Sequence, residues 1–295
     1  MEAHSAPSSR WSAGHLAALL LANVALALGP WFVRLADTGP VAAGFWRLTL
    51  ALPVIFVLSR RDPIQRRSVS GATLALVAGA GVFFALDLAS WHIGIATTKL
   101  ANASLFGNSG SVILMAWGLI AARRAPRALE IIAILCALSG AAVLMGGSLE
   151  ISHASFVGDL FCLLAGFFYA FYILMLAPAR ARLGQFSLLF WSTLTGAPIL
   201  LGVAALMGEA IVPGNWTPLL VLAMSSQVVG QGLLIYSLKN FPPLVIGLAL
   251  LTQPAISALT GWLAFGEMLS AGDVLGMVLL AGALVLAKVG DRAAP

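Results

Sequence analysis

Residues 244–287 decide the fold, and they read LVIGLALLTQPAISALTGWLAFGEMLSAGDVLGMVLLAGALVLA. The stretch consists of two apolar runs, 244–265 and 272–287, joined by a short polar elbow. Each run has about 16 to 22 residues, which at about 1.5 Å per residue crosses most or all of a hydrocarbon layer about 30 Å thick. The pattern predicts two consecutive membrane helices, the first with Gln253 and Pro254 at its middle.

A fainter copy of this pattern lies upstream, in the apolar runs 101–121 and 128–147 and the basic elbow between them. In each copy a polar residue interrupts the first run, Asn108 upstream and Gln253 downstream. Because self-similarity along a chain is a sign of duplicated structure, we expect two related halves.

The composition is that of a membrane protein. Of the 295 residues, 60% are hydrophobic and only 9% are charged, and the mean hydropathy is +0.99. A soluble domain has roughly 25% charged residues, so a soluble protein is excluded. The net charge is +5, but the basic residues lie in short clusters between apolar runs, which is typical of a cytoplasmic membrane face and not of a nucleic-acid partner.

Hydropathy windows of about 19 residues predict ten membrane helices with short loops. We expect them at residues 15–35, 41–58, 72–93, 101–121, 128–147, 156–177, 187–207, 218–238, 244–265 and 272–289. Residues 1–14 are polar and should form a disordered cytoplasmic segment, not a cleaved signal peptide. The rest divides into a first half, 15–147, a second half, 148–290, and a short cytoplasmic tail, 291–295.

The basic residues set the expected orientation in the inner membrane. With both termini in the cytoplasm, 13 of the 16 Lys and Arg residues lie on the cytoplasmic side, as the positive-inside rule requires. These are Arg10, Arg60, Arg61, Arg66, Arg67, Arg123, Arg124, Arg127, Arg180, Arg182, Lys239, Lys288 and Arg292.

Five helices per half place the second half upside down relative to the first. The sequence therefore predicts an all-α membrane protein, with ten transmembrane helices as two inverted five-helix repeats around a central cavity. Many secondary transporters use this construction, with the substrate between halves that rock around it.

Polar residues inside apolar helices identify the candidate site, because a polar group in hydrocarbon must face protein, water or a cavity. Asp87 and Trp91 are four residues apart and share a helix face, with His92 beside them. Asp87 could bind a substrate amine or a proton, or it could be an interfacial carboxylate or part of a helix–helix hydrogen bond. His92 could also take part in proton coupling.

Amide side chains extend this set. Gln227 and Gln231 are again four residues apart, and Asn108 and Gln253 lie inside two other helices. We expect them to line the same cavity as the carboxylate. Hydrogen bonds that only hold membrane helices together would explain them as well.

Arg47 and Pro254 are candidates for substrate binding, coupling or gating. Arg47 could bind a carboxylate, or it could extend to the lipid headgroups beside Trp46 at the outer surface. Pro254 could mark a hinge, since a proline removes a helical hydrogen bond, or it could be a packing kink.

One pattern is similar to a catalytic site. Residues 107–110, GNSG, match the Gly-x-Ser-Gly of rhomboid-type intramembrane proteases. Ser109 would need a histidine to activate it, and the only later histidine is His153, in a predicted loop. We therefore expect no enzyme. With no zinc motif, P-loop or Rossmann glycine pattern in the sequence, we expect no metal or cofactor.

Residues 250–267, LLTQPAISALTGWLAFGE, resemble the ending of the ninth helix in EamA-type members of the drug/metabolite transporter superfamily. Gly276 and Gly282 in the next helix are similar too, as are Arg47 and the 87–91 pair in the first half. The resemblance covers residues 11–290. The first half departs from it in two places: residues 109–111, SGS, stand in place of the proline, and Arg124 stands in place of Glu267.

The resemblance implies a carrier that exports or exchanges amino acids or related small metabolites. Two alternatives from other classes are a hydrolase that uses Ser109 and a non-transporting membrane interaction protein. The apolar outer faces of helices 128–147 and 272–289 could support a homodimer or could face the lipid bilayer.

Overall fold

The computed structural model describes residues 12–62, 70–98, 103, 106–146, 156–265 and 268–292. Several residues considered above lie outside the described ones: most of the N-terminal segment, the last three residues, Arg10, Arg66, Arg67, His153 and Glu267. At the N-terminus, residues 13 and 14 already belong to the first helix and not to a disordered segment.

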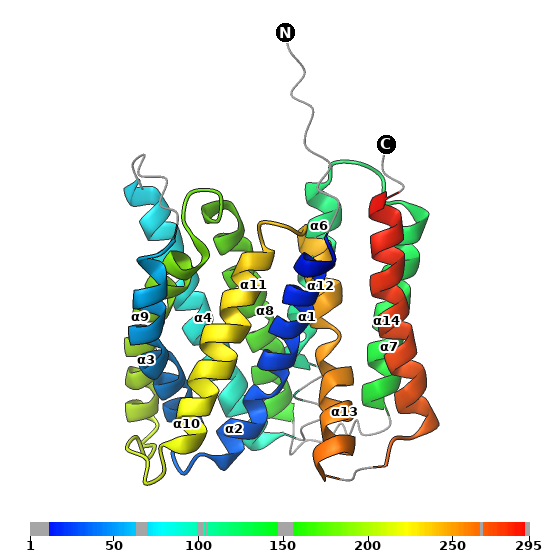
Figure 1. The fold of residues 1–295 in the computed structure, drawn as a ribbon. Coiled ribbons are helices and arrows are strands. Elements are labelled where there is room, and N and C mark those ends of the chain that lie inside the picture. The colour runs from blue at the N-terminus through cyan, green and yellow to red at the C-terminus, as the bar shows by residue number, and fades with distance from the viewer. Residues whose placement is uncertain are drawn as a thin grey trace.

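The described residues form helices and contain no strand. Seven helical segments are long and apolar enough to cross a membrane, and three shorter apolar helices lie at Ser109–Ala121, Ala128–Leu144 and Pro243–Ile256. The chain is therefore a multi-pass membrane protein. The helices stand side by side in one bundle, with both ends of the described chain on the same side (Figure 1).

The helices, in chain order, are α1 (Ala13–Ala27), α2 (Gly29–Leu35), α3 (Pro40–Ser59), α4 (Gly71–Thr97), α6 (Ser109–Ala121), α7 (Ala128–Gly146), α8 (Phe156–Ala179), α9 (Gln185–Leu206), α10 (Thr217–Leu222), the π-helix η1 (Ala223–Gln231), α11 (Gly232–Ser237), α12 (Pro243–Leu250), α13 (Gln253–Phe265) and α14 (Ala271–Arg292).

Four segments expected as continuous α-helices are divided, and in the one expected at 101–121 a turn at Asn108 precedes α6. Pro30 and Pro254 are the second residues of α2 and α13, which follow breaks in the first and ninth expected helices. Proline has no N–H group and fits best in the first turn of a helix, and each of these two breaks lies just before the proline. The eighth expected helix changes into the wider π-helix η1 at its centre.

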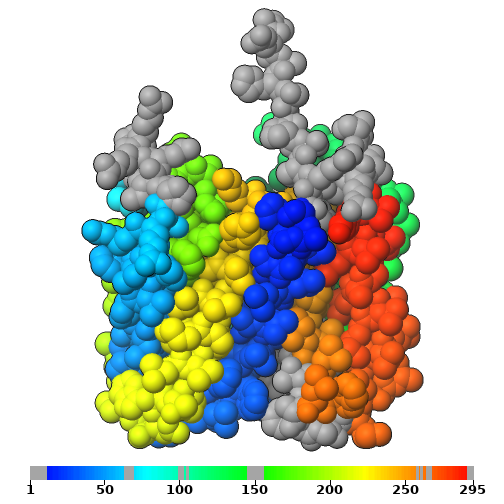
Figure 2. All heavy atoms as spheres, in the orientation of Figure 1, coloured from blue at the N-terminus to red at the C-terminus, as the bar shows by residue number. Residues whose placement is uncertain are grey.

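Helices from the two halves of the chain pack against each other. The pairs α3 with α9, α6 with α12, and α7 with α14 make extensive contacts, and α4 packs against α8 and α9. On one face, α1 and α2 form a band between the segment 217–237 and helices α12 and α13 (Figure 2). Large apolar side chains on the outside of the bundle, such as Leu135 and Val285, are exposed.

The α3–α9 pair is capped at both ends by a carboxylate from the partner helix. Glu209, just after α9, accepts hydrogen bonds from the backbone N–H groups of Val41 (3.2 Å) and Ala42 (2.7 Å) at the start of α3. Asp62, just after α3, accepts from the backbone N–H (2.7 Å) and hydroxyl (2.9 Å) of Ser187 at the start of α9. These N–H groups have no partner within their own helix and attract negative charge.

Glycine makes room for both carboxylates. Gly39 and Gly184 precede α3 and α9. A Cβ atom at Gly39 would lie 2.4 Å from the Glu209 side chain, and one at Gly184 would lie 2.1 Å from the Asp62 side chain. Both distances are too short for real contacts, so a larger residue would displace the carboxylate.

We predict that Gly39→Ala lowers the thermal unfolding midpoint of the detergent-purified protein, because the new methyl group displaces Glu209 from α3. Loss of a helix cap costs about 1 kcal/mol, which corresponds to a shift of about 2 to 4 °C for a chain of this order of size. Scanning fluorimetry measures it. Gly202→Ala is the control, because its added Cβ would meet no atom within 4 Å. Equal midpoints for the two variants would refute the cap.

Candidate functional site

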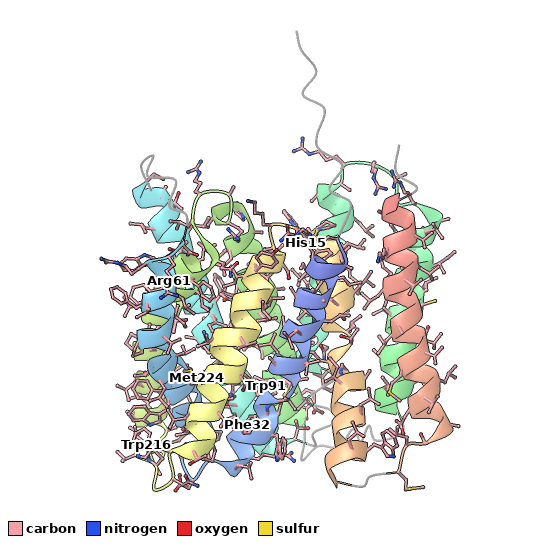
Figure 3. All side chains as sticks on the ribbon, in the orientation of Figure 1. His15, Phe32, Arg61, Trp91, Trp216 and Met224 are labelled. Atoms are coloured by element: carbon pink, nitrogen blue, oxygen red, sulfur yellow. The ribbon has the colours of Figure 1, made fainter. Side chains whose placement is uncertain are left out.

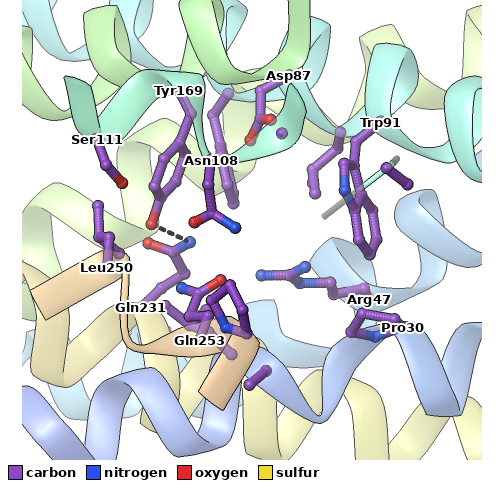
Figure 4. A pocket seen from close by; sticks show the side chains of 17 residues that line it. Pro30, Arg47, Asp87, Trp91, Asn108, Ser111, Tyr169, Gln231, Leu250 and Gln253 are labelled. Atoms are coloured by element: carbon purple, nitrogen blue, oxygen red, sulfur yellow. Dashed lines mark hydrogen bonds between the residues drawn. The ribbon is translucent and has the colours of Figure 1, made fainter. Parts of the chain in front are cut away.

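A cavity of about 140 Å³ lies where the helices are interrupted. Its walls come from α1, α2, α3, α4, α6, α8, η1, α12 and α13 (Figure 4). The lining residues are Leu26, Ala27, Pro30, Arg47, Phe84, Asp87, Leu88, Trp91, Ala103, Gly107, Asn108, Ser111, Tyr169, Gln231, Leu250, Gln253 and Pro254.

The structure brings most of the expected site residues together in this cavity. Five of the six residues expected to line it do so: Asp87, Trp91, Asn108, Gln231 and Gln253. Two residues expected to act in coupling or gating, Arg47 and Pro254, also line it. Gln227 and His92 do not.

The interruptions position these side chains. Pro30 and Pro254 follow the breaks after α1 and α12, and Asn108 occupies a turn just before α6. A proline at position 254 has no N–H to donate to the carbonyl of Leu250, four residues earlier, and both residues line the cavity. Irregular backbone inside a membrane protein is tolerated where it lines a cavity or is buried in protein.

Arg47 is the buried cation of the site. It lies inside α3, is only 6% exposed, and therefore does not extend to the lipid headgroups. Its Nε donates to Oε1 of Gln227 at 3.1 Å, and its guanidinium lies 5.8 Å from the centre of the Phe84 ring. Its Nη2 is buried without a hydrogen-bond partner. A buried donor left unsatisfied is costly, so an acceptor on a bound ligand would stabilise it.

Gln227 lies behind Arg47 and not in the cavity wall, which corrects the expectation from sequence. It is fully buried. Its amide oxygen accepts from Arg47, and its Nε2 donates to the Thr193 hydroxyl on α9 at 3.0 Å. Gln227 therefore orients the guanidinium and links η1 to α3 and α9.

His92 also points away from the cavity. Its Nδ1 is hydrogen-bonded to the Pro40 carbonyl at the start of α3, and its Nε2 is buried without a partner. Successive residues in an α-helix are about 100° apart, so His92 leaves the face that Asp87 and Trp91 share. We correct its expected place beside Asp87 accordingly.

Asp87 is the acidic residue of the cavity. It is 9% exposed, and it makes no hydrogen bond or ion pair to any residue in the described part of the chain. It lines the same cavity as Arg47. Figure 4 shows both side chains facing the same open space, with Trp91 at its side.

Tyrosine and amide groups form the opposite wall. Gln231 Nε2 donates to the Tyr169 hydroxyl at 3.4 Å (Figure 4), and the Tyr172 hydroxyl donates to Gln231 Oε1 at 3.5 Å. Tyr172 stacks on Phe84 with ring centres 4.5 Å apart. Gln253 Nε2 donates to Asn23 Oδ1 at 3.3 Å. Long hydrogen bonds of this kind leave the amides able to exchange partners with a ligand.

Sequence reasoning missed Phe84, Ser111 and Asn23. Phe84 is apolar and gave no signal, although it lies three residues before Asp87 on the same helix face. Ser111 lies three residues after Asn108, and this spacing could have indicated it. Asn23 is a fully buried polar residue in an apolar helix, so it met the criterion that selected Gln253.

Ser109 has no histidine beside it among the described residues. Its hydroxyl donates to the Leu163 carbonyl of α8 at 3.3 Å. The described histidines, His15 and His92, contact Tyr236 and Pro40 instead. In the same part of the chain, no group of three His, Cys, Asp or Glu side chains could hold a metal ion.

We predict that Gln227→Leu destabilises the protein by about 1 to 3 kcal/mol, because it removes the partner of a buried, charged donor. Gln227→Glu should be tolerated, since a carboxylate accepts from both Arg47 and Thr193. Denaturation in detergent, followed by tryptophan fluorescence, compares them. The matched control is Gln185→Leu, because Gln185 is half-buried and makes no side-chain hydrogen bond to described residues. Similar losses for Gln227→Leu and Gln185→Leu would contradict the assigned role.

The sequence is similar to known transporters. Residues 156–288 match the model of the EamA-like transporter family. Threonine/homoserine exporter RhtA of Escherichia coli (strain K12) is 26% identical over 256 residues, which cover 85% of this chain and 81% of that protein. An uncharacterized transporter of Archaeoglobus fulgidus is 23% identical over 270 residues, covering 91% of this chain and 94% of that protein.

A crystal structure of another protein superposes on this chain with a TM-score of 0.75. The two share 16% sequence identity, and the superposition covers 94% of this chain and 97% of the other. At this identity the likeness establishes a common fold.

Proposed function

Because this chain is an EamA-type member of the drug/metabolite transporter superfamily, we propose that it exports or exchanges amino acids or related small metabolites across the inner membrane by alternating access. Membership makes it a transmembrane transporter of small metabolites. The polar cavity at the helix interruptions carries the finer proposal, since secondary transporters bind substrate where helices are discontinuous.

Helix packing supports two inverted five-helix repeats, 15–147 and 148–290. If the helices of each half are numbered from one to five, the pairs α3–α9, α6–α12 and α7–α14 each join helices of the same number. The contacts of α4 with α8 have a counterpart in those of η1 and α11 with α1. This is the pattern expected of halves related by a two-fold axis.

The distribution of charge supports cytoplasmic termini. Arg61 and His15 lie toward the side that bears the termini, and Trp216 lies toward the other side (Figure 3). Arg60, Arg123 and Arg182 are exposed, and they lie in the connections between helices on the side where the two termini lie. Clusters of this kind are retained in the cytoplasm.

The contacts also support a division into fixed and moving parts. Carboxylate caps tie α3 to α9 at both ends, so we expect this pair to stay fixed while other helices move. The breaks before Pro30 and Pro254 face the cavity and are the natural hinges. Asp87, which is accessible from the cavity, is a better candidate for proton coupling than His92, which is not.

The other readings are supported less well. A hydrolase that uses Ser109 would need an activating base, and the serine packs against α8 instead. A non-transporting interaction protein would have no need of a polar cavity with opposite charges. A homodimer through α7 and α14 stays an expectation, because their exposed apolar residues also suit lipid.

Counterflow in proteoliposomes with a panel of amino acids and small metabolites tests the transport proposal. We predict that Asp87→Asn and Gln231→Ala each reduce exchange of the identified substrate by on the order of 10-fold or more, since each removes a polar group from the cavity. Leu206→Ala is the control, because Leu206 is 90% exposed. Exchange of no panel member would contradict transport, and unchanged rates in both cavity variants would contradict the site.

A further inference from the structure

We propose that the cavity recognises both ends of a small zwitterion, with the Arg47 guanidinium binding a carboxylate and the Asp87 carboxylate binding an ammonium group. This inference rests on the proposed transport function and names the chemistry of its substrate. The ligand class is a free α-amino acid with a short side chain.

The first observation is the unsatisfied donor of Arg47. The residue is more than nine-tenths buried, its Nε is engaged by Gln227, and its Nη2 has no partner. Gln227 is in turn fixed by Thr193, so the guanidinium is held in one orientation. Arginine presents a planar fork of N–H groups that matches a carboxylate. The guanidinium end of Arg47 is directed into the cavity (Figure 4).

The second observation is that Asp87 offers acceptors without donors. Nothing in the described part of the chain donates a hydrogen bond to it, although it faces the cavity from α4. A carboxylate in this position is stabilised by a cation that supplies N–H donors.

The third observation is that these two side chains line one cavity without forming an ion pair with each other. A direct pair would satisfy both groups and would leave no charge for a ligand. Across an open space, each group lacks the partner that a zwitterion supplies at its opposite ends. A ligand with only one charge would satisfy one group and leave the other buried and unpaired, which is costly.

The size of the cavity limits the side chain. A cavity of about 150 Å³ holds a molecule the size of benzene, and this one measures about 140 Å³. A short amino acid fits such a space, whereas an aromatic one would have to extend out of the cavity on its open side. Ser111 and Gln231 line the wall and suit a ligand side chain that bears a hydroxyl group.

Three matched ligands test the inference in proteoliposome counterflow: L-threonine, its decarboxylated analogue 1-amino-2-propanol, and its deaminated analogue 3-hydroxybutyrate. The wild type should exchange threonine at least ~10-fold better than either analogue, a difference of about 1.4 kcal/mol. L-phenylalanine should compete poorly. Equal exchange of threonine and either analogue overturns the inference.

Two variants test which residue binds the carboxylate of the ligand and which binds its ammonium group. Arg47→Gln should lower the preference for threonine over 1-amino-2-propanol while keeping the preference over 3-hydroxybutyrate. Asp87→Asn should do the opposite. A purely structural role for these residues would reduce exchange of all three compounds in parallel, and that result overturns the assignment. Leu206→Ala should change nothing.

Arg47→Lys covers the case in which Arg47→Gln does not fold. It retains the charge, so it should keep some preference for threonine over 1-amino-2-propanol, with weaker exchange. Complete loss of that preference in the folded lysine variant overturns the inference. Failure of this inference can be told apart from failure of the transport proposal. Exchange of other metabolites but of no amino acid overturns zwitterion recognition alone. Exchange of no solute overturns the transport proposal as well.

Discussion

The structure depends on the burial of one guanidinium among helices of both halves. A charged residue at the centre of a membrane helix costs about 2.5 to 3.5 kcal/mol on insertion scales. Arg47 offsets this cost with a hydrogen bond from η1 and the face of an aromatic ring on α4. Arg47 and these two partners lie on three different helices, α3, α4 and η1, so the site can form only when the two halves are packed together. The donor that is still unpaired is what makes the site suitable for a ligand.

The helix interruptions are the second part of the same arrangement. An unbroken apolar helix would present only side chains to the cavity, whereas breaks at α1–α2 and α12–α13 bring backbone and proline to its wall. The turn at Asn108 and the turn at residues 251–252 occupy corresponding places in the two halves. The α3–α9 pair is different, because it has no break and is capped at both ends. In the proposed mechanism the interrupted helices supply the flexibility, and the α3–α9 pair is the rigid part that carries Arg47.

Sequence reasoning located the helices and much of the cavity, for a clear reason. Apolar runs of membrane-spanning length are long, and polar residues within them are rare, so Asp87 and Gln253 were conspicuous. The sequence could not show which neighbouring helix each of these side chains faces. Gln227 and Gln231 are four residues apart and were expected to share a helix face, yet Gln227 is hydrogen-bonded to Arg47, which is far away in the sequence. Whether Arg47 faces lipid or protein depends on the packing of α3 against α9, which no local pattern contains.

Access to the cavity from both sides of the membrane is the central claim, and thiol labelling measures it most directly. Ser111 lines the cavity, and Ser111→Cys is nearly isosteric. The background replaces the free cysteines Cys136 and Cys162 with alanine. A small membrane-impermeant thiol reagent should label the introduced cysteine when it is added to either side, and L-threonine should slow both reactions. Labelling from neither side, or from one side only, would contradict the account.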